Sequence, residues 1–468
     1  MGKSDRKSFG EIKMSIYVNR SLNMKYIAAI GFDMDHTIVR YHTKNFEEMV
    51  FKETVRKLIE EKKYPKKIEE FKFEYSRAIR GLLVDRKNGN IIKISRFNRV
   101  KTSFHGTKAL DFKASQKLYK GLSIDVGDSN YSVVDTNFSV AYTSLYSLLV
   151  DFKDSNPDIE LPSYEKIESD IIDAVDMSHR DGTLKNEVRK NISQYIIQDP
   201  DIVSTLERLK KYKKKLLVIT NSDYHYSKLL LDYTMTPFLK DHAHWLDLFE
   251  IVITGSAKPA FFLENRAFLK VDADTAMMAN HNGPIIPGIY QGGSAAQLQK
   301  SLGLKGDQIL YLGDHIYGDI LTLKKSIGWR TALVIEEIED EVMALKRATP
   351  VSKKIDDLMN QKNHLEDQLN LLYSQEHEFD LKVDHAEVQK TYDEILELDR
   401  QLSEKIIDYN SHFNPYWGTV MRSGNEESYL AGQVERYACI YMKKISDFSL
   451  YSPRTYFRPL KRLMAHEV

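Results

Sequence analysis

Residues 25–36, KYIAAIGFDMDH, run from an apolar segment directly into two aspartates, Asp33 and Asp35. Four later segments contain a similar near-continuous apolar run, and they are residues 215–222, 248–255, 308–315 and 331–337. Continuous rather than alternating apolar residues are typical of strands buried on both faces of a parallel sheet. Helical sequence lies between several of these runs, as at residues 201–213, where apolar positions recur at helical spacing. The pattern predicts a doubly wound α/β core with a parallel sheet.

The chain between the first two predicted strands is too long for a simple crossover, so it should form a subdomain of its own. It mixes strand-like sequence at residues 90–97 with helical sequence at residues 141–152. We therefore expect an α+β cap at residues 43–189, inserted after the first core strand. The core then comprises residues 1–42 and 190–345.

After the fifth predicted strand the chain becomes rich in Glu, Lys, Leu and Gln. Apolar positions between residues 355 and 372 predict a long amphipathic helix, and a second helix follows around residues 388–407. We expect residues 346–468 to form a helical C-terminal extension packed on the core. A long coiled coil is the alternative, although the breaks and the uneven apolar spacing favour a helical hairpin.

Composition and charge exclude several classes of protein. Of the 468 residues, 42% are hydrophobic, which excludes a largely disordered chain. The 67 basic and 67 acidic residues balance, which argues against a nucleic-acid or membrane partner. Cys439 is the only cysteine, so neither an intramolecular disulfide nor a cysteine-rich metal cluster can form. Because residues 1–20 lack the apolar core of a secretory signal, we expect a cytoplasmic protein.

Polar side chains with useful chemistry follow four of the predicted strands. In chain order they are Asp33 and Asp35, Thr220 and Asn221, Lys258, and Asp314 and Asp319. Ligands of open α/β sheets bind outside the carboxyl ends of the strands, so these side chains should converge on one pocket. One carboxylate could attack an electrophile while another transfers a proton. So many carboxylates need a cation among them, and hard oxygen ligands select Mg²⁺. Together with a lysine and a hydroxyl that face an anion, they predict a phosphoryl-transfer site.

Each of these signals has an ordinary structural interpretation when it stands alone. Aspartates are common at strand ends and in turns. A Thr-Asn pair after a strand often caps a helix. The functional interpretation depends on four signals that occur in order, each after a predicted strand.

The stretches FDMDHT, VITNS, AKP and GDHIYGD resemble the four ordered motifs of the haloacid dehalogenase (HAD) superfamily. The similarity is closer to the cytosolic purine 5′-nucleotidase family, which prefers IMP and GMP. RGLLVDRKNGNIIKI, SHRDGTLK, GIYQGGS and the C-terminal QVERYACIYM also resemble that family. The resemblance therefore covers nearly the whole chain, and it implies a HAD-like core with a cap.

The resemblance implies a role for each motif residue. Asp33 is similar to the nucleophile that forms an aspartyl-phosphate, and Asp35 to the acid that protonates the leaving ribose oxygen and later activates water. The Mg²⁺ ligands would be the carboxylates of Asp33 and Asp314 and the backbone carbonyl of Asp35, with Asp319 supporting them. The phosphate oxygens would be held by Thr220, Asn221, Lys258 and, from the cap, Lys185.

The resemblance also implies where the purine and an effector would bind. Phe138, Asp176 and His179 are similar to base-contacting positions, although a phenylalanine here is equally consistent with core packing. Ile172 stands where the vertebrate members have an arginine, which leaves the ranking of IMP and GMP open. A purine-nucleotide effector such as ATP or GTP would meet Tyr317, Lys325, Arg436 and Tyr437, or these are surface residues of ordinary helices. The family also implies a homo-oligomer, commonly a tetramer.

Three functions are consistent with these residues. The first is a Mg²⁺-dependent 5′-nucleotidase that hydrolyses GMP and IMP and transfers phosphate to nucleosides. The second is a HAD phosphatase for another phosphomonoester, such as a sugar phosphate. The third, a non-enzymatic nucleotide-binding regulator, is disfavoured because all the motif carboxylates, Thr220 and Lys258 are present.

Overall fold

The computed structural model describes residues 15–461 and 463–467. Its largest element is a ten-stranded sheet. In sheet order the strands are β1 (Ile16–Val18), β20 (Ile440–Met442), β17 (Arg330–Val334), β16 (Ile309–Gly313), β3 (Ala29–Phe32), β11 (Lys215–Ile219), β12 (Ile251–Thr254), β15 (Gly288–Gly292), β13 (Phe268–Val271) and β14 (Met278–His281). The seven strands from β20 to β15 are parallel, while β1, β13 and β14 add antiparallel pairs at the two edges. The predicted parallel core is confirmed.

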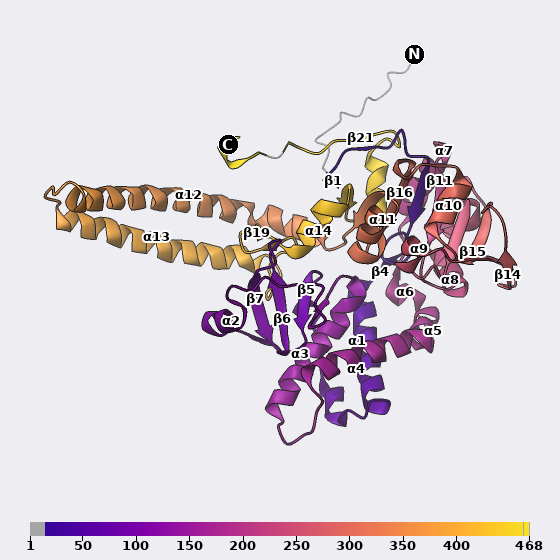
Figure 1. Ribbon diagram of the computed structural model, residues 1–468, viewed down its shortest axis with the longest axis horizontal. Coiled ribbons are helices and arrows are strands. Elements are labelled where there is room, and N and C mark those ends of the chain that lie inside the picture. Colours follow the sequence, from indigo (N-terminus) through magenta and orange to yellow (C-terminus); the bar gives the residue numbers. More distant parts are fainter. Residues whose placement is uncertain (1–14, 462, 468) are drawn as a thin grey trace, which may run out of the picture. The chain divides into compact units, whose positions relative to one another are not determined.

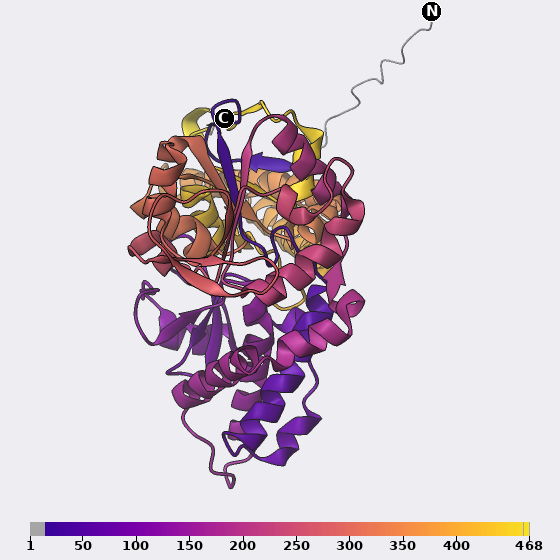
Figure 2. The same cartoon turned by 90° about the vertical axis from the view of Figure 1, so that its right-hand side faces the viewer.

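Helices cover both faces of this sheet (Figure 2). They are α7 (Pro200–Lys211), α8 (Tyr224–Thr234), α9 (Ala260–Leu263), α10 (Ala295–Leu302) and α11 (Thr322–Ser326). The helix α7 begins where its sequence predicts, because the Asp199 side chain accepts a hydrogen bond from the Asp201 backbone nitrogen and Pro200 occupies the first turn. All residues of β3, β12 and β16 are buried, as expected for strands with helices on both faces.

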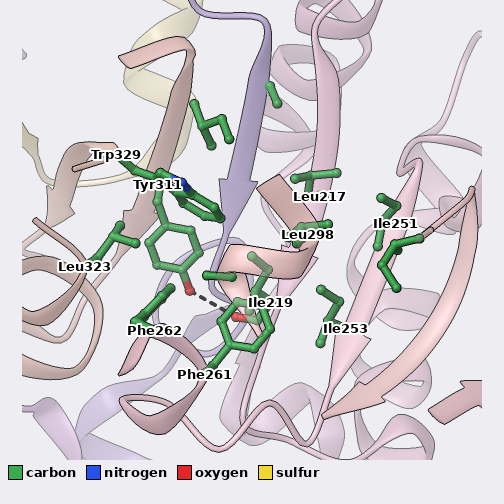
Figure 3. Packing of buried hydrophobic residues seen from close by; sticks show 14 of the residues in the cluster. Leu217, Ile219, Ile251, Ile253, Phe261, Phe262, Leu298, Tyr311, Leu323 and Trp329 are labelled. Atoms are coloured by element: carbon green, nitrogen blue, oxygen red, sulfur yellow. Dashed lines mark hydrogen bonds between the residues drawn. The ribbon is translucent and has the colours of Figure 1, made fainter. Parts of the chain in front are cut away.

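The core beside α9, α10 and α11 is rich in aromatic side chains (Figure 3). Phe261 and Phe262 come from α9, Tyr311 from β16 and Trp329 from the turn before β17. The Phe262 ring lies edge-on to Tyr311, with their centroids 5.5 Å apart. This packing supports the carboxyl ends of strands that are followed by predicted pocket residues.

A second sheet lies in the long segment that follows β3 (Figure 1). Its five antiparallel strands, in order, are β8 (Lys108–Ala109), β7 (Val100–His105), β6 (Asn90–Ile94), β5 (Leu82–Asp85) and β9 (Tyr131–Val133). The main helices of the same segment are α1 (Thr43–Glu60), α3 (Val140–Ser155), α4 (Tyr164–Arg180) and α5 (Thr183–Lys190). An α+β cap inserted after the first central strand is therefore confirmed. Its boundaries at residues 43 and 189 stay a prediction, because cap and core belong to one compact unit.

Residues 337–420 form a second compact unit. It consists of two long helices, α12 (Ile338–His377) and α13 (His385–Ser411), which lie side by side (Figure 1). The prediction of a helical hairpin in this region is confirmed. Packing of the hairpin on the core stays a prediction.

We expect residues 346–468 to form a helical extension, but the structure shows that this segment is helical only in part. From Met421 onward the chain belongs to the first unit, where it supplies α14 (Tyr429–Tyr437) and the strand β20. That strand pairs in parallel with β17 and antiparallel with β1. The apolar run from Ala438 to Met442 is too short for its period to distinguish a strand from a helix.

Candidate active site

Asp33 is the first residue after β3 and lies at the carboxyl edge of the sheet. Its backbone nitrogen donates to the Leu312 carbonyl oxygen of the neighbouring strand β16 at 2.8 Å. Its Oδ1 accepts hydrogen bonds from the Met34 backbone nitrogen at 2.7 Å and forms an ion pair with Lys258 Nζ at 2.8 Å. Both the backbone and the carboxylate of Asp33 are therefore held in place, which suits a nucleophile.

Lys258 connects two carboxylates. Its Nζ lies 2.8 Å from Asp33 Oδ1 and 2.8 Å from Asp319 Oδ1, and the side chain is only 4% exposed. Burial disfavours the charged lysine, but Asp319 and Asp33 outweigh burial, so the pKa of Lys258 is raised above its usual value. Burial and the neighbouring carboxylates raise the pKa of Asp33, against the opposing charge of Lys258. The two carboxylates thus favour the charged form of this buried lysine.

Three carboxylates meet beside this lysine. Asp33, Asp314 and Asp319 each offer an oxygen, and these atoms all lie within 4.8 Å of one another. Asp314 is 6% exposed, and its buried Oδ2 has no hydrogen-bond partner among the residues that the structure describes. Burial, with the charge of Asp319 and against that of His36, raises the pKa of Asp314 to about 6. Crowded oxygens and an unsatisfied buried acceptor fit a divalent cation, which supplies the missing positive charge.

Asp319 is itself a member of this cluster, although the sequence predicts only a supporting role for it. It belongs to the π-helix η7 (Ile316–Leu321), and its carboxylate approaches Gly313 so closely that a Cβ there would lie 2.3 Å from Asp319 Oδ2. The glycine before Asp314 is therefore needed for the approach. The Asp35 side chain is not part of the cluster, which leaves only its backbone carbonyl for a metal.

Both carboxylate oxygens of Asp35 accept hydrogen bonds. The Tyr41 hydroxyl donates to Oδ1 at 2.6 Å, and the Ser222 hydroxyl donates to Oδ2 at 2.7 Å. Sequence reasoning missed both donors, although Ser222 directly follows the predicted Thr-Asn pair. A carboxylate held in this way is oriented independently of Asp33, which is two residues earlier, so the two groups can perform different tasks.

Asn221 holds the loop that carries Lys258. Its Oδ1 accepts from the Lys258 backbone nitrogen at 2.6 Å and from Ser256 Oγ at 2.9 Å, while its Nδ2 donates to the Lys258 carbonyl oxygen at 3.1 Å. The alternative that Thr220 and Asn221 cap a helix is wrong, because Asp223 is the residue that caps α8. Lys185 reaches the same region from the cap, where it pairs with the Asp223 carboxylate.

A pocket of about 420 Å³ joins these residues to the cap. All but one of the predicted catalytic, metal, phosphate and base residues line it, namely Asp33, Asp35, Phe138, His179, Lys185, Thr220, Asn221, Lys258, Asp314 and Asp319. The exception is Asp176, which is exposed on α4 and does not line the pocket. It lies one helical turn before His179, and burial lowers the pKa of His179 against the opposing charge of Asp176.

The cap end of the pocket is aromatic. The Phe138 ring lies edge-on to His36 at 4.6 Å and to Phe46 at 5.6 Å between centroids. His36 in turn stacks on Tyr41 at 4.6 Å. Phe46 and Tyr41 also line the pocket, so a flat ring entering it would meet an apolar wall.

Comparison with known proteins agrees with this chemistry. A protein-family model described as the 5′ nucleotidase family matches residues 16–468. The chain belongs to the 5′ nucleotidase family. It is 26% identical over 462 residues to a 5′-nucleotidase domain-containing protein of Dictyostelium discoideum, covering 97% of this chain and 74% of that protein. The predicted class, a 5′-nucleotidase and hence a phosphoric monoester hydrolase, is confirmed at the level of the family.

Two solved phosphatase structures show weaker similarity to this family member. A predicted phosphoglycolate phosphatase from Haemophilus somnus 129PT is 14% identical, with 66% of this chain and 86% of that chain covered and a TM-score of 0.29. A HAD phosphatase from Thermococcus onnurineus is 15% identical, with 66% and 87% covered and a TM-score of 0.27. Scores this low carry no argument about the site.

The residues predicted to bind an effector lie together in this 5′-nucleotidase family member. Lys325 Nζ and Arg436 Cζ lie 5.5 Å and 5.4 Å from the centroid of the Tyr437 ring. Tyr317 donates a hydrogen bond from its hydroxyl to that of Tyr429 at 2.8 Å. Tyr437 is only 7% exposed, so the side chains of the protein itself already cover its ring. An effector role for these residues stays a prediction.

Proposed function

We propose that this chain is a Mg²⁺-dependent 5′-nucleotidase that hydrolyses GMP and IMP to the nucleoside and phosphate. The observation that carries the proposal is the pair of aspartates after β3. Asp33 is paired with Lys258 at 2.8 Å, whereas Asp35 is held by Tyr41 and Ser222 at 2.6 and 2.7 Å. Two carboxylates in different environments suit a nucleophile and an acid–base group.

In the first step an Asp33 oxygen attacks phosphorus. The bond between phosphorus and the ribose O5′ breaks, and Asp35 donates its proton to that oxygen as the nucleoside leaves. Lys258 and Thr220 hold phosphate oxygens, so the ammonium group balances the charge that accumulates in the transition state. Lys185 would add a second cation from the cap.

In the second step water attacks the phosphorus of the aspartyl-phosphate. Asp35 now accepts a proton from this water, and the bond between phosphorus and the Asp33 oxygen breaks to release inorganic phosphate. Asp33 and Asp314, the Asp35 backbone carbonyl and the nearby Asp319 would hold Mg²⁺. When bound, the metal supplies positive charge that offsets the repulsion between these carboxylates and the phosphate.

The purine would occupy the aromatic end of the pocket, with the Phe138 ring against its face. His179 lines the same pocket, and Asp176, one turn earlier on α4, would approach the base if the substrate or the cap moves. A cytoplasmic location, a homo-oligomer and an ATP or GTP effector at Tyr317, Lys325, Arg436 and Tyr437 complete the proposal.

The decisive experiment is a substrate panel with and without Mg²⁺. Phosphate release is measured from GMP, IMP, AMP, pyrimidine monophosphates and sugar phosphates, each with and without ATP or GTP. We expect Mg²⁺-dependent release that is fastest with GMP and IMP. Faster release from a sugar phosphate would favour a different HAD phosphatase, and no release from any compound would favour a non-enzymatic nucleotide-binding protein. Light scattering that reports only monomer would contradict the homo-oligomer.

A further inference from the structure

Tyr311 is a fully buried residue of β16 whose hydroxyl reaches the candidate active site. Its ring packs against Phe262 and Trp329, with centroid distances of 5.5 and 6.4 Å (Figure 3). On the neighbouring strand β3, a Cβ at Gly31 would lie 2.9 Å from Tyr311 Cδ2. The ring therefore has little freedom, and its hydroxyl occupies a defined position.

The hydrogen bonds of this hydroxyl have a fixed direction. It donates to the Ile219 carbonyl oxygen at 3.0 Å (Figure 3). A longer contact of 3.4 Å joins it to Asp319 Oδ1. A phenol has one hydrogen, and both of these oxygens are acceptors. The hydroxyl can therefore offer Lys258 only a lone pair, and Lys258 Nζ lies 2.9 Å away.

Tyr311 completes the coordination of the Lys258 ammonium group. An ammonium group has three hydrogens, and in the described part of the chain three acceptors lie within 2.9 Å of Nζ, namely Asp33 Oδ1, Asp319 Oδ1 and the Tyr311 hydroxyl. Asp33 and Asp319 are also candidate metal ligands, so a bound metal would compete with Lys258 for them. The phenol is neutral, buried and wedged, so it is the acceptor that stays.

We infer that Tyr311 is a positioning residue, whose hydroxyl fixes the Lys258 ammonium group beside Asp33 and thereby sets the affinity of the site for a phosphate group. The inference rests on the proposed role of Lys258 in phosphate binding. It also gives the Ile219 carbonyl a function, because that group orients the phenol and directly precedes Thr220.

The test compares two tyrosine-to-phenylalanine variants from the same aromatic core. Tyr311→Phe keeps the ring and removes only the hydroxyl that faces Lys258. The matched control is Tyr290→Phe, because Tyr290 is also fully buried in this core, yet its hydroxyl donates to the Ile286 carbonyl at 3.0 Å. Binding of inorganic phosphate in the presence of Mg²⁺ is measured by calorimetry, and urea unfolding reports the stability of each variant.

We expect Tyr311→Phe to weaken phosphate binding about 10- to 100-fold, the usual effect of removing a hydrogen bond to a buried charge. Tyr290→Phe should bind phosphate like the wild type, although it should lose about as much stability as Tyr311→Phe. In a Lys258→Met background, Tyr311→Phe should cause no further loss, because its effect passes through the lysine. Equal phosphate affinity in the two phenylalanine variants, or no phosphate binding by the wild type, would overturn the inference.

Turnover distinguishes this inference from the proposed function. A wild-type protein that binds phosphate but hydrolyses no monophosphate refutes the nucleotidase proposal, while the comparison of the two variants still decides the role of Tyr311. If turnover occurs, Tyr311→Phe should lower kcat/KM for GMP by a similar factor. A structural defect alone would instead lower the amount of active protein without changing KM.

Discussion

The guanidinium group of Arg80 donates a hydrogen bond to the backbone carbonyl oxygen of Asp314 at 3.0 Å. Arg80 lies in the cap just before β5 and is 2% exposed, whereas Asp314 follows the core strand β16. The cap thus holds a charged side chain directly against the backbone of a candidate metal ligand. Its positive charge opposes the effect of burial on the pKa of Asp314.

Removal of Arg80 should therefore weaken metal binding. We expect Arg80→Met to raise the Mg²⁺ concentration needed for half-maximal activity at least about 10-fold, as is typical when a partner of a metal ligand is lost. Arg86→Met is the control, since Arg86 pairs with Glu168 inside the cap at 3.1 Å. The activity and the thermal stability of both variants are measured as Mg²⁺ is titrated. An unchanged Mg²⁺ requirement in Arg80→Met would show that the contact does not support the metal site.

Asp33→Asn should abolish turnover while the protein stays folded. The amide keeps the shape of the side chain but cannot form an acyl phosphate, and loss of an essential nucleophile costs on the order of 10⁴-fold or more. Phosphate release measures turnover, and a circular dichroism spectrum shows whether the variant is folded. Trapping of a phosphoryl or beryllofluoride group on another residue would refute the assignment.

Glu47 should make the stability of the protein depend on pH. It lies on α1, is fully buried, and accepts one hydrogen bond from the Ala141 backbone nitrogen at 2.7 Å. Burial raises its pKa from 4.5 to about 8. The folded state therefore keeps a proton that the unfolded state releases near pH 4.5, so the contribution to stability is complete below that pH and is lost as the pH rises toward 8.

Glu47→Gln should remove this dependence, because the amide is neutral at every pH. Between pH 5 and 8 the free energy of unfolding of the wild type should fall by up to about 1.4 kcal/mol per pH unit relative to the variant. Urea unfolding at several pH values provides the measurement. The neighbouring Glu48, whose side chain is 45% exposed, gives the control variant Glu48→Gln. Parallel pH profiles for the wild type and Glu47→Gln would mean that Glu47 is charged in the folded protein.

Asp176 should select the base if it acts as proposed. Guanine and hypoxanthine carry a hydrogen on N1, whereas adenine presents an acceptor there, and an ionised carboxylate can only accept. An unmatched acceptor pair costs about 1–3 kcal/mol or more, so AMP should be a poor substrate. Because the carboxylate can also accept from the 2-amino group of guanine, GMP should be at least as good as IMP. Asp176→Ala should lower kcat/KM for GMP far more than for AMP. An unchanged ratio would leave Asp176 as an ordinary exposed residue of α4.

The proposed covalent intermediate implies transfer of phosphate to a second nucleoside. A nucleoside in the pocket can take the place of water, so that its 5′-hydroxyl attacks the aspartyl-phosphate while Asp35 accepts the proton. With labelled inosine present during GMP hydrolysis, we expect labelled IMP. If phosphate is released but no label enters IMP, acceptor transfer does not occur under those conditions.

The centre of the fold follows from hydrophobic pattern, and its edges do not. All five apolar runs predicted as strands are strands, because burial on both faces leaves a strong signal. The strand β15 was missed, since its sequence GIYQG contains two glycines and a glutamine. The strands β1 and β20 were missed because three residues are too few to show a period.

The residues of the candidate site also divide into those that the sequence predicts and those that it does not. Residues that carry charge directly after a strand, such as Asp33 and Lys258, could be predicted because their chemistry and their position coincide. Arg80 and Tyr311 could not, because each acts through a partner that is distant in sequence. Tyr41 lies only six residues from Asp35, but nothing in the sequence shows that the turn between them brings its hydroxyl onto that carboxylate. Arg80 occurs in the quoted RGLLVD stretch, but nothing in its local spacing indicates a contact with Asp314.

The pairing of β1 with β20 has a consequence for biosynthesis. Ile16 pairs with Met442, so β1 stays unpaired until β20 has been synthesised. A message truncated before codon 440 would encode all of β3, β11 and β16, with Asp33, Lys258 and Asp314 in place, yet leave one edge of β17 unpaired. Unpaired strand edges recruit other chains. Nascent chains of this nucleotidase family member should therefore need protection from aggregation until β20 has been synthesised and has paired.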